Sequence, residues 1–110
     1  MKNVRDFLTR VDQRNITSNT QRVLCRLLHA NGGWVQGDDI CQTVLSVATN
    51  LTEATTARVR DLRKPQFGGF PVECRSARQL HRAGGQKVFF YRILPERVTV
   101  KQVAKTLGMI

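Results

Sequence analysis

Apolar residues at helical spacing mark the first half of the chain. Over about residues 2–14 they follow an i, i+3, i+4, i+7 pattern, which predicts an amphipathic helix that buries Val4, Phe7, Leu8 and Val11. A second helix is predicted over about 19–31, from the capping box Ser18-Asn19-Thr20-Gln21 to the stop signal Asn31-Gly32-Gly33. A short extended segment, 34–36, precedes a third helix over about 38–46, whose inward residues are Ile40, Val44 and Leu45.

The second half begins with a fourth predicted helix over about 51–64. Asn50 is placed to cap its first turn, and Pro65 ends it, since proline disfavours helical geometry in the residue before it. A turn-rich loop is predicted over 66–71. Near the end of the chain, the capping box Thr99-Val100-Lys101-Gln102 opens a short helix that Gly108 ends.

Between these helices, alternating and β-branched residues predict two strands, 72–75 and 87–93. The segment 76–86 contains two glycines and no acidic residue, which predicts a long basic hairpin loop. Side chains alternate between the two faces of a strand, so Phe89, Tyr91 and Ile93 share one face of the second strand. We expect this face to join the core, together with Val72 and Cys74 of the first strand. On this interpretation Phe90 lies outside the core, where it covers the adjacent loop or packs under a terminal helix.

The predicted class is therefore α+β and mostly helical. A chain of 110 residues with 41% hydrophobic residues has room for one domain with its own core. We expect residues 1–110 to form this single domain, with its centre over about 19–94 and flanking helices within 1–17 and 98–110.

The net charge of +10 points to an anionic partner. Residues 58–92 carry nine basic and two acidic side chains, so that one third of the chain holds a net charge of +7. A charge run is often only a solvated face, but its concentration in one segment favours a surface that binds nucleic acid.

The fourth predicted helix supplies the first part of this surface. At about 100° per residue, one face holds Leu51, Thr55, Val59 and Leu62, and the face taken as opposite holds Glu53, Thr56, Arg60, Arg63 and Lys64. Arginine bonds bidentately to guanine in the major groove, so we expect Arg60 to read bases. We also expect Thr56 to contact a base edge or a thymine methyl group. Arg63 and Lys64 are expected on phosphate, and Glu53 either accepts from cytosine N4 or serves the helix cap.

The hairpin loop supplies the second part, with basic residues around Gly84-Gly85. Its arginines are expected on phosphate or in the minor groove, where the negative potential attracts them. The predicted DNA-binding residues are Thr56, Arg58, Arg60, Arg63, Lys64, Arg78, Arg82 and Lys87.

This order of elements resembles the winged helix-turn-helix DNA-binding fold. The resemblance covers about residues 19–94. Its local pattern is the run from Thr56 to Lys64, a glycine-containing turn, Val72-Glu73-Cys74-Arg75 and Phe90-Tyr91-Arg92-Ile93. The run is similar to one in small winged-helix proteins of phages and mobile elements. The resemblance implies a recognition helix in the major groove of duplex DNA, a basic hairpin on the backbone or minor groove, and no cofactor.

Other chemistry has little support in the sequence. The cysteines, Cys25, Cys41 and Cys74, form no closely spaced ligand pair, so we expect reduced thiols and no metal site. Two histidines and no phosphate-binding glycine motif argue against an enzyme and a small-molecule substrate. No apolar run approaches the ~20 residues of a membrane span, and no leader is expected at the N-terminus, so the expected compartment is the cytoplasm.

The functional prediction is sequence-specific DNA binding by a small regulator or recombination accessory protein. The alternative is a protein-interaction module that binds an acidic partner, and RNA binding comes third because a stacking sheet has little support. Val4, Phe7, Leu8 and Val11 either cover the domain's own core or form the seam of a homodimer.

Overall fold

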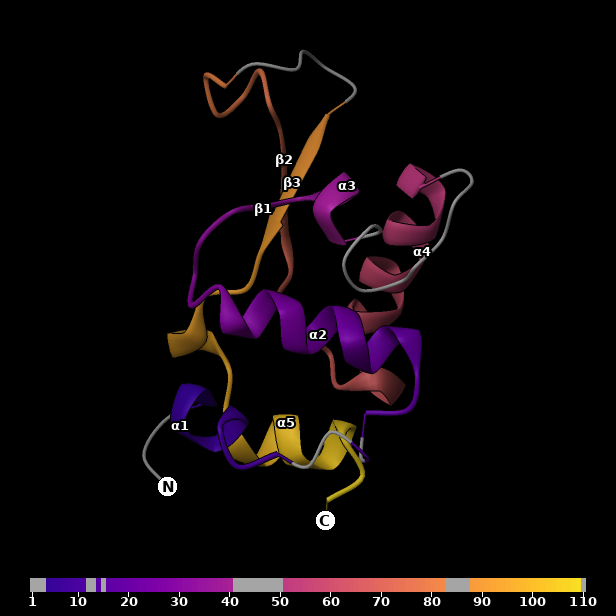
Figure 1. The fold of residues 1–110 in the computed structure, drawn as a ribbon, viewed down its shortest axis with the longest axis vertical. Helices are drawn as coiled ribbons and strands as arrows, with labels where there is room; N and C mark the ends of the chain where they lie inside the picture. The colour runs from indigo at the N-terminus through magenta and orange to yellow at the C-terminus, as the bar shows by residue number, and fades with distance from the viewer. Residues whose placement is uncertain (1–3, 12–13, 15, 41–50, 83–87, 110) are drawn as a thin grey trace.

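The computed structural model describes residues 4–11, 14, 16–40, 51–82 and 88–109, with the side chains of residues 5 and 51–54 outside this description. It shows an α+β arrangement, in which helices surround one side of a small antiparallel sheet (Figure 1). The elements in chain order are α1 (Val4–Leu8), α2 (Asn19–His29), β1 (Val35–Gln36), α3 (Gly37–Ile40), α4 (Leu51–Arg63), the 3-10 turn η3 (Pro65–Phe67), β2 (Glu73–Ser76), β3 (Phe89–Arg92), the 3-10 turn η4 (Pro95–Arg97) and α5 (Val100–Thr106).

Helix α2 runs through the middle of the molecule, and its start confirms the predicted capping box. The Ser18 hydroxyl accepts from the backbone N–H of Gln21, and the Gln21 side chain accepts from the backbone N–H of Ser18. The helix ends at His29, where Asn31 takes a φ of 52° and the glycines follow. The second predicted capping box, between Thr99 and Gln102, is likewise present at the start of α5.

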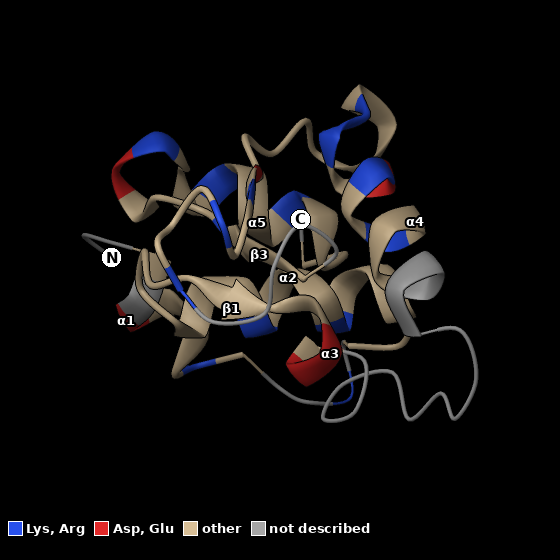
Figure 2. Ribbon diagram, turned by 90° about the horizontal axis from the view of Figure 1, so that it is seen from above, with Lys and Arg blue, Asp and Glu red and all other residues tan. Residues whose placement is uncertain are grey.

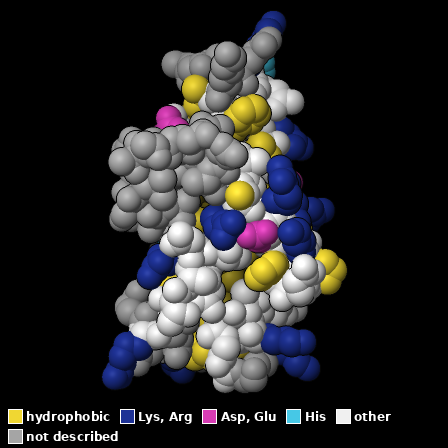
Figure 3. Space-filling model, turned by 90° about the vertical axis from the view of Figure 1, so that its right-hand side faces the viewer, with side chains coloured by type: hydrophobic (Ala, Val, Ile, Leu, Met, Phe, Trp, Pro, Cys, Tyr) yellow, Lys and Arg dark blue, Asp and Glu magenta, His cyan; other side chains and the backbone are white. Residues whose placement is uncertain are grey.

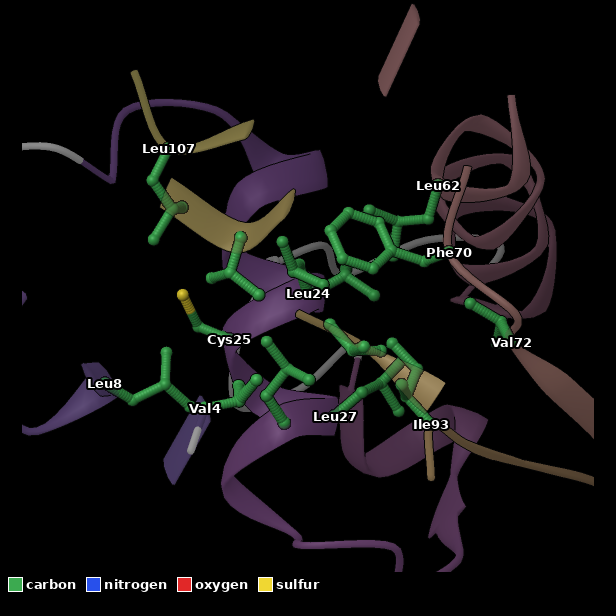
Figure 4. Close-up of a cluster of buried hydrophobic side chains, with 14 of the residues drawn as sticks. Val4, Leu8, Leu24, Cys25, Leu27, Leu62, Phe70, Val72, Ile93 and Leu107 are labelled. Carbon is green, nitrogen blue, oxygen red and sulfur yellow. The ribbon is translucent and has the colours of Figure 1, made fainter. Parts of the chain in front are cut away.

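The core lies between α2, α4 and the sheet, with α1 and α5 closing its other side (Figure 4). From α2 it takes Val23, Leu24, Leu27 and Leu28, and from α4 Val59 and Leu62. Tyr91 contributes from β3, and Ile93 from the position directly after it. Phe70, which follows η3, is also fully buried, although the sequence indicated only a loop there. This core therefore joins segments from both halves of the chain.

The terminal segments belong to this same core. Val4, Phe7, Leu8 and Val11 are all buried within the chain. This burial favours the interpretation that α1 covers its own domain over the interpretation that it forms a dimer seam. Helix α1 ends at Leu8, before the predicted end at residue 14. The Thr9 hydroxyl donates to the Asp6 carbonyl there, and the Arg10 N–H bonds three residues back to the Phe7 carbonyl.

The sheet has the order β1-β3-β2, and β3 is antiparallel to both neighbours. Val35 pairs with Tyr91, and Cys74 pairs with Tyr91 on the other side. The predicted hairpin and the short extended segment at 34–36 are thus present in one sheet. Predicted helix residues 41–46, which include Val44 and Leu45, and the predicted cap Asn50 lie outside the described part of the chain.

The prediction for Phe89 and Phe90 was wrong. Phe89 is 36% exposed, whereas Phe90 is 8% exposed. Phe89 points to the same side of the sheet as Tyr91, but there it lines a surface hollow with Gly37, Asp38 and Thr55, so its ring is only partly covered. Phe90 lies on the other side, where the Arg82 guanidinium packs on its ring, 4.9 Å from the centroid. Tyr91, Ile93 and Val72 are buried as predicted, and Cys74 is half-buried.

Candidate nucleic-acid interface

Helix α4 turns one face into the core and another to solvent. Thr55, Val59 and Leu62 are buried, as the helical spacing predicts, while Arg60 is exposed. The side chains of Leu51 and Glu53, assigned to the two faces by the sequence, lie outside the description. A hydrogen bond from the Thr55 hydroxyl to the Gly37 carbonyl, 3.2 Å long, fixes α4 against the start of α3.

Asp61 organises the basic side chains near the end of α4. Its two carboxylate oxygens lie 3.3 Å from Arg58 Nη2 and 3.4 Å from Lys64 Nζ. Both partners are three residues away from Asp61, Arg58 on α4 and Lys64 directly after its end, and both are more exposed than Asp61. One carboxylate thus holds two cations at the surface, and the group with Arg60 keeps a net charge of +2 (Figure 3).

Among these three cations, Arg60 is the one that does not pair with Asp61. It is exposed, and the structure gives it no hydrogen bond or ion pair among the described residues. Its position on the helix is about 140° from Thr55, well away from the buried face. An unpartnered guanidinium on a solvent-facing helix is free to bind phosphate or a guanine edge.

Thr56 and Arg63 lie between the buried face of α4 and the face opposite it, nearer the core than predicted from the sequence. At about 100° per residue, the two positions coincide within about 20° and lie on the flank of α4 that faces the sheet. Thr56 is half-buried, and its side chain hydrogen-bonds with Tyr91, the pKa of which is raised by burial. Arg63 donates from Nε and Nη2 to the Val72 carbonyl, at 3.2 and 2.9 Å. Both residues thus link α4 to the strand region, although Arg63 remains exposed.

The described part of the hairpin loop is an ordered turn. Ser76 and Gln79 exchange two hydrogen bonds, and Ala77 N–H donates to the Val88 carbonyl at 2.7 Å. Arg78 and Arg82 are exposed on this turn, and Arg82 is stacked on Phe90. Lys87, the remaining predicted loop contact, lies outside the described residues.

Of the predicted residues, the structure therefore places Arg58 and Arg60 on α4 and Lys64 directly after it, links Arg58 and Lys64 through Asp61, and places Arg78 and Arg82 on the hairpin. Sequence reasoning missed the cations of the sheet itself, Arg75 and Arg92, and Arg97 in η4. Alternation in 72–75, which puts Glu73 and Arg75 opposite Val72 and Cys74, was a usable signal for Arg75. Arg92 lies over the Trp34 ring, and no local pattern indicates this contact because the two residues are 58 positions apart in the sequence.

The described residues hold no group of three His, Cys, Asp or Glu side chains placed to bind a metal ion. Cys25 is buried in the core and Cys74 half-buried beside it, while Cys41 lies outside the described residues. None of the helices that the structure describes has the length and apolar character needed to span a bilayer.

Cys25 should be almost unreactive in the folded protein. Burial raises the pKa of its thiol from 9.0 to about 11, which lowers the thiolate fraction about 100-fold, and the thiolate is the nucleophile. In a Cys41→Ser, Cys74→Ser variant, we expect a thiol reagent at pH 8 to modify Cys25 at least about 100-fold more slowly in buffer than in denaturant. Equal rates, with circular dichroism showing a folded protein, would contradict the buried position.

Comparisons of this chain with protein-family models, with curated proteins and with solved structures gave no match.

Proposed function

We propose that this chain is a winged-helix protein that binds duplex DNA, with α4 in the major groove and the β2–β3 hairpin on the backbone or in the minor groove. The order of the elements supports this proposal, since two helices, a short strand and two further helices precede a hairpin that pairs with the short strand. The observation that carries it is the basic surface of α4, where Arg60 is exposed, has no partner among the residues that the structure describes, and lies about 40° from Lys64 around the helix.

We propose different DNA contacts for α4 and for the hairpin. Arg60 is the proposed base-reading residue, because a helix enters the major groove and arginine bonds bidentately to guanine O6 and N7. Arg58, Lys64 and Arg78 are the proposed phosphate contacts on this duplex. Thr56 and Arg63 position α4 on the sheet. In this function the protein is a small transcription regulator or a recombination accessory protein of a phage or mobile element, acting in the cytoplasm, with no cofactor and no catalytic step.

The salt dependence of binding tests the proposal directly. Titrations of a labelled duplex at several salt concentrations should give a log affinity that falls with log salt, with a slope near −4.5 if ~5 phosphates are neutralised. A duplex selected from a random library should bind more tightly than mixed-sequence duplex. If no duplex binds at low salt, the protein-interaction module with an acidic partner becomes the better proposal.

Arg60→Ala should weaken binding to the selected duplex about 5- to 150-fold and narrow its advantage over mixed sequence, because base contacts carry discrimination. The matched control is Lys101→Ala, which removes the same charge from an exposed site on α5 and should change the affinity little. Neither side chain belongs to the core, so circular dichroism should show both variants folded. Equal affinities of the two variants for the selected duplex would remove α4 as the recognition helix.

A further inference from the structure

The three-stranded sheet has a second side, which faces away from α4. Alternation along the strands puts Cys74 and Tyr91 on the inner side, where Tyr91 bonds with Thr56 of α4. The neighbouring pairs in the register, Glu73 with Arg92 and Arg75 with Phe90, therefore lie on the other side of the sheet. We call this side, together with Trp34, Glu96 and Arg97 at its border and Arg82 over the Phe90 ring, the outer sheet face.

Two arginines on this face are held in place by aromatic rings. The Arg92 guanidinium lies over Trp34, 4.3 Å from the ring centroid, and its Nε also forms an ion pair with Glu73. Arg82 covers Phe90 in the same manner. These contacts fix both guanidinium groups and leave part of each in water, since Arg92 is half-buried and Arg82 exposed.

Two further arginines add charge, and neither forms an ion pair within 4.0 Å among the described residues. Arg75 and Arg97 are both exposed, and with Arg92 they lie near enough to Glu73 to lower the pKa of its carboxyl, mainly through the hydrogen bond from Arg92. Arg75 Nη1 donates to the adjacent Cys74 carbonyl, and Glu96 is the exposed acidic neighbour of Arg97. Four arginines against two acidic residues leave the face with a net charge of +2.

The outer sheet face and the basic face of α4 lie on opposite sides of the molecule. In Figure 1, α4 is on the right of the hairpin and the gold turn of η4, which carries Arg97, is on the left. Figure 2 shows Lys and Arg on α4 at one side and on η4 at the other. A single straight duplex seated on α4 therefore leaves the outer sheet face uncovered.

We propose that the outer sheet face binds the phosphate backbone of a second duplex DNA segment, so that one chain bridges two duplexes. Phosphate is favoured over single-stranded bases, because Arg92 and Arg82 already cover the rings on which bases would stack. This inference rests on the proposed function, since α4 holds the first duplex.

A capture experiment measures bridging separately from binding. One short duplex is fixed to beads, the full chain is added, and a fluorescent second duplex is recovered with the beads. Wild-type protein should recover the second duplex. In Arg75→Ala with Arg97→Ala, recovery should fall about tenfold or more, because two charge-assisted phosphate contacts are lost, while affinity for one short duplex changes about twofold or less.

The matched control is Lys101→Ala with Lys105→Ala, two exposed positions on α5 that remove the same total charge and should leave capture unchanged. Arg97→Gln alone, which breaks no described hydrogen bond, keeps the test decisive if the double variant does not fold. Wild-type binding of one duplex without capture of a second overturns this inference and leaves the proposed function standing. Capture that persists in Arg75→Ala with Arg97→Ala also overturns it, and failure to bind any duplex overturns both.

Discussion

Replacing Phe70 by alanine should lower the free energy of unfolding by about 3–5 kcal/mol. The Phe70 side chain is 1% exposed and lies between α2 and α4, beside Leu24 and Leu62 (Figure 4). Alanine would lose most of this buried area and leave a cavity, because α2 and α4 are also held apart by their other core side chains. The backbone N–H of Phe70 donates to the Leu62 carbonyl at 2.7 Å, so the residue also supplies a hydrogen bond to the last turn of α4.

The control for this prediction lies three residues earlier. Phe67 is 39% exposed, and Phe67→Ala removes the same aromatic group from the surface. We expect it to cost about 1 kcal/mol or less, in keeping with surface substitutions away from special features. Urea denaturation followed by circular dichroism gives both values. Similar losses in the two variants would mean that Phe70 does not occupy the core position described here.

Elements determined by neighbouring residues could be predicted from the sequence. The caps at Ser18 and Thr99 each need only a hydroxyl and a glutamine three residues later, and both formed. Pro65 ended α4 at the predicted place, since the steric effect of proline acts on the residue before it. The inward residues of α2 and α4 followed from helical spacing alone.

Features that depend on distant segments could not be predicted in this way. Whether Thr56 and Arg63 project into solvent depends on the sheet that packs beside α4, which helical spacing does not include. The burial of Phe70 depends on how η3 returns the chain to the core. For Phe89 and Phe90, strand alternation was right, but the end of the core along β3 was not visible in the sequence.

The same distinction between local and distant determinants applies to the candidate site. Arg60 could be selected from the sequence because its exposure follows from its own helix. The outer sheet face could not, because Trp34, Glu73 and Arg92 come from three strands or their borders and meet only after the sheet forms. The charge concentration in 58–92 covered both surfaces but did not separate them.

Gly68→Ala should cost about 2–5 kcal/mol, because it combines backbone strain with overpacking. Gly68 has a φ of +110° at the end of η3. A Cβ there would overlap the Phe70 ring and lie 2.6 Å from Thr106 Oγ1. The Gly68 carbonyl also accepts a hydrogen bond from Gln102 Nε2 at 2.6 Å. The substitution would therefore disturb the contact of η3 with both the core and α5.

Gly69→Ala separates these two causes. Gly69 also has a positive φ, +61°, but a Cβ there meets nothing closer than Pro65 Cα at 3.8 Å. It should lose only about 1–2 kcal/mol, the strain of a left-handed alanine. Thermal and urea denaturation of both variants gives the difference, and duplex binding at low temperature checks that the surface of α4 persists in the folded fraction. If Gly69→Ala is the more destabilising of the two, the packing of η3 against Phe70 and Thr106 is not the tight contact described here, and the cost comes from the backbone alone.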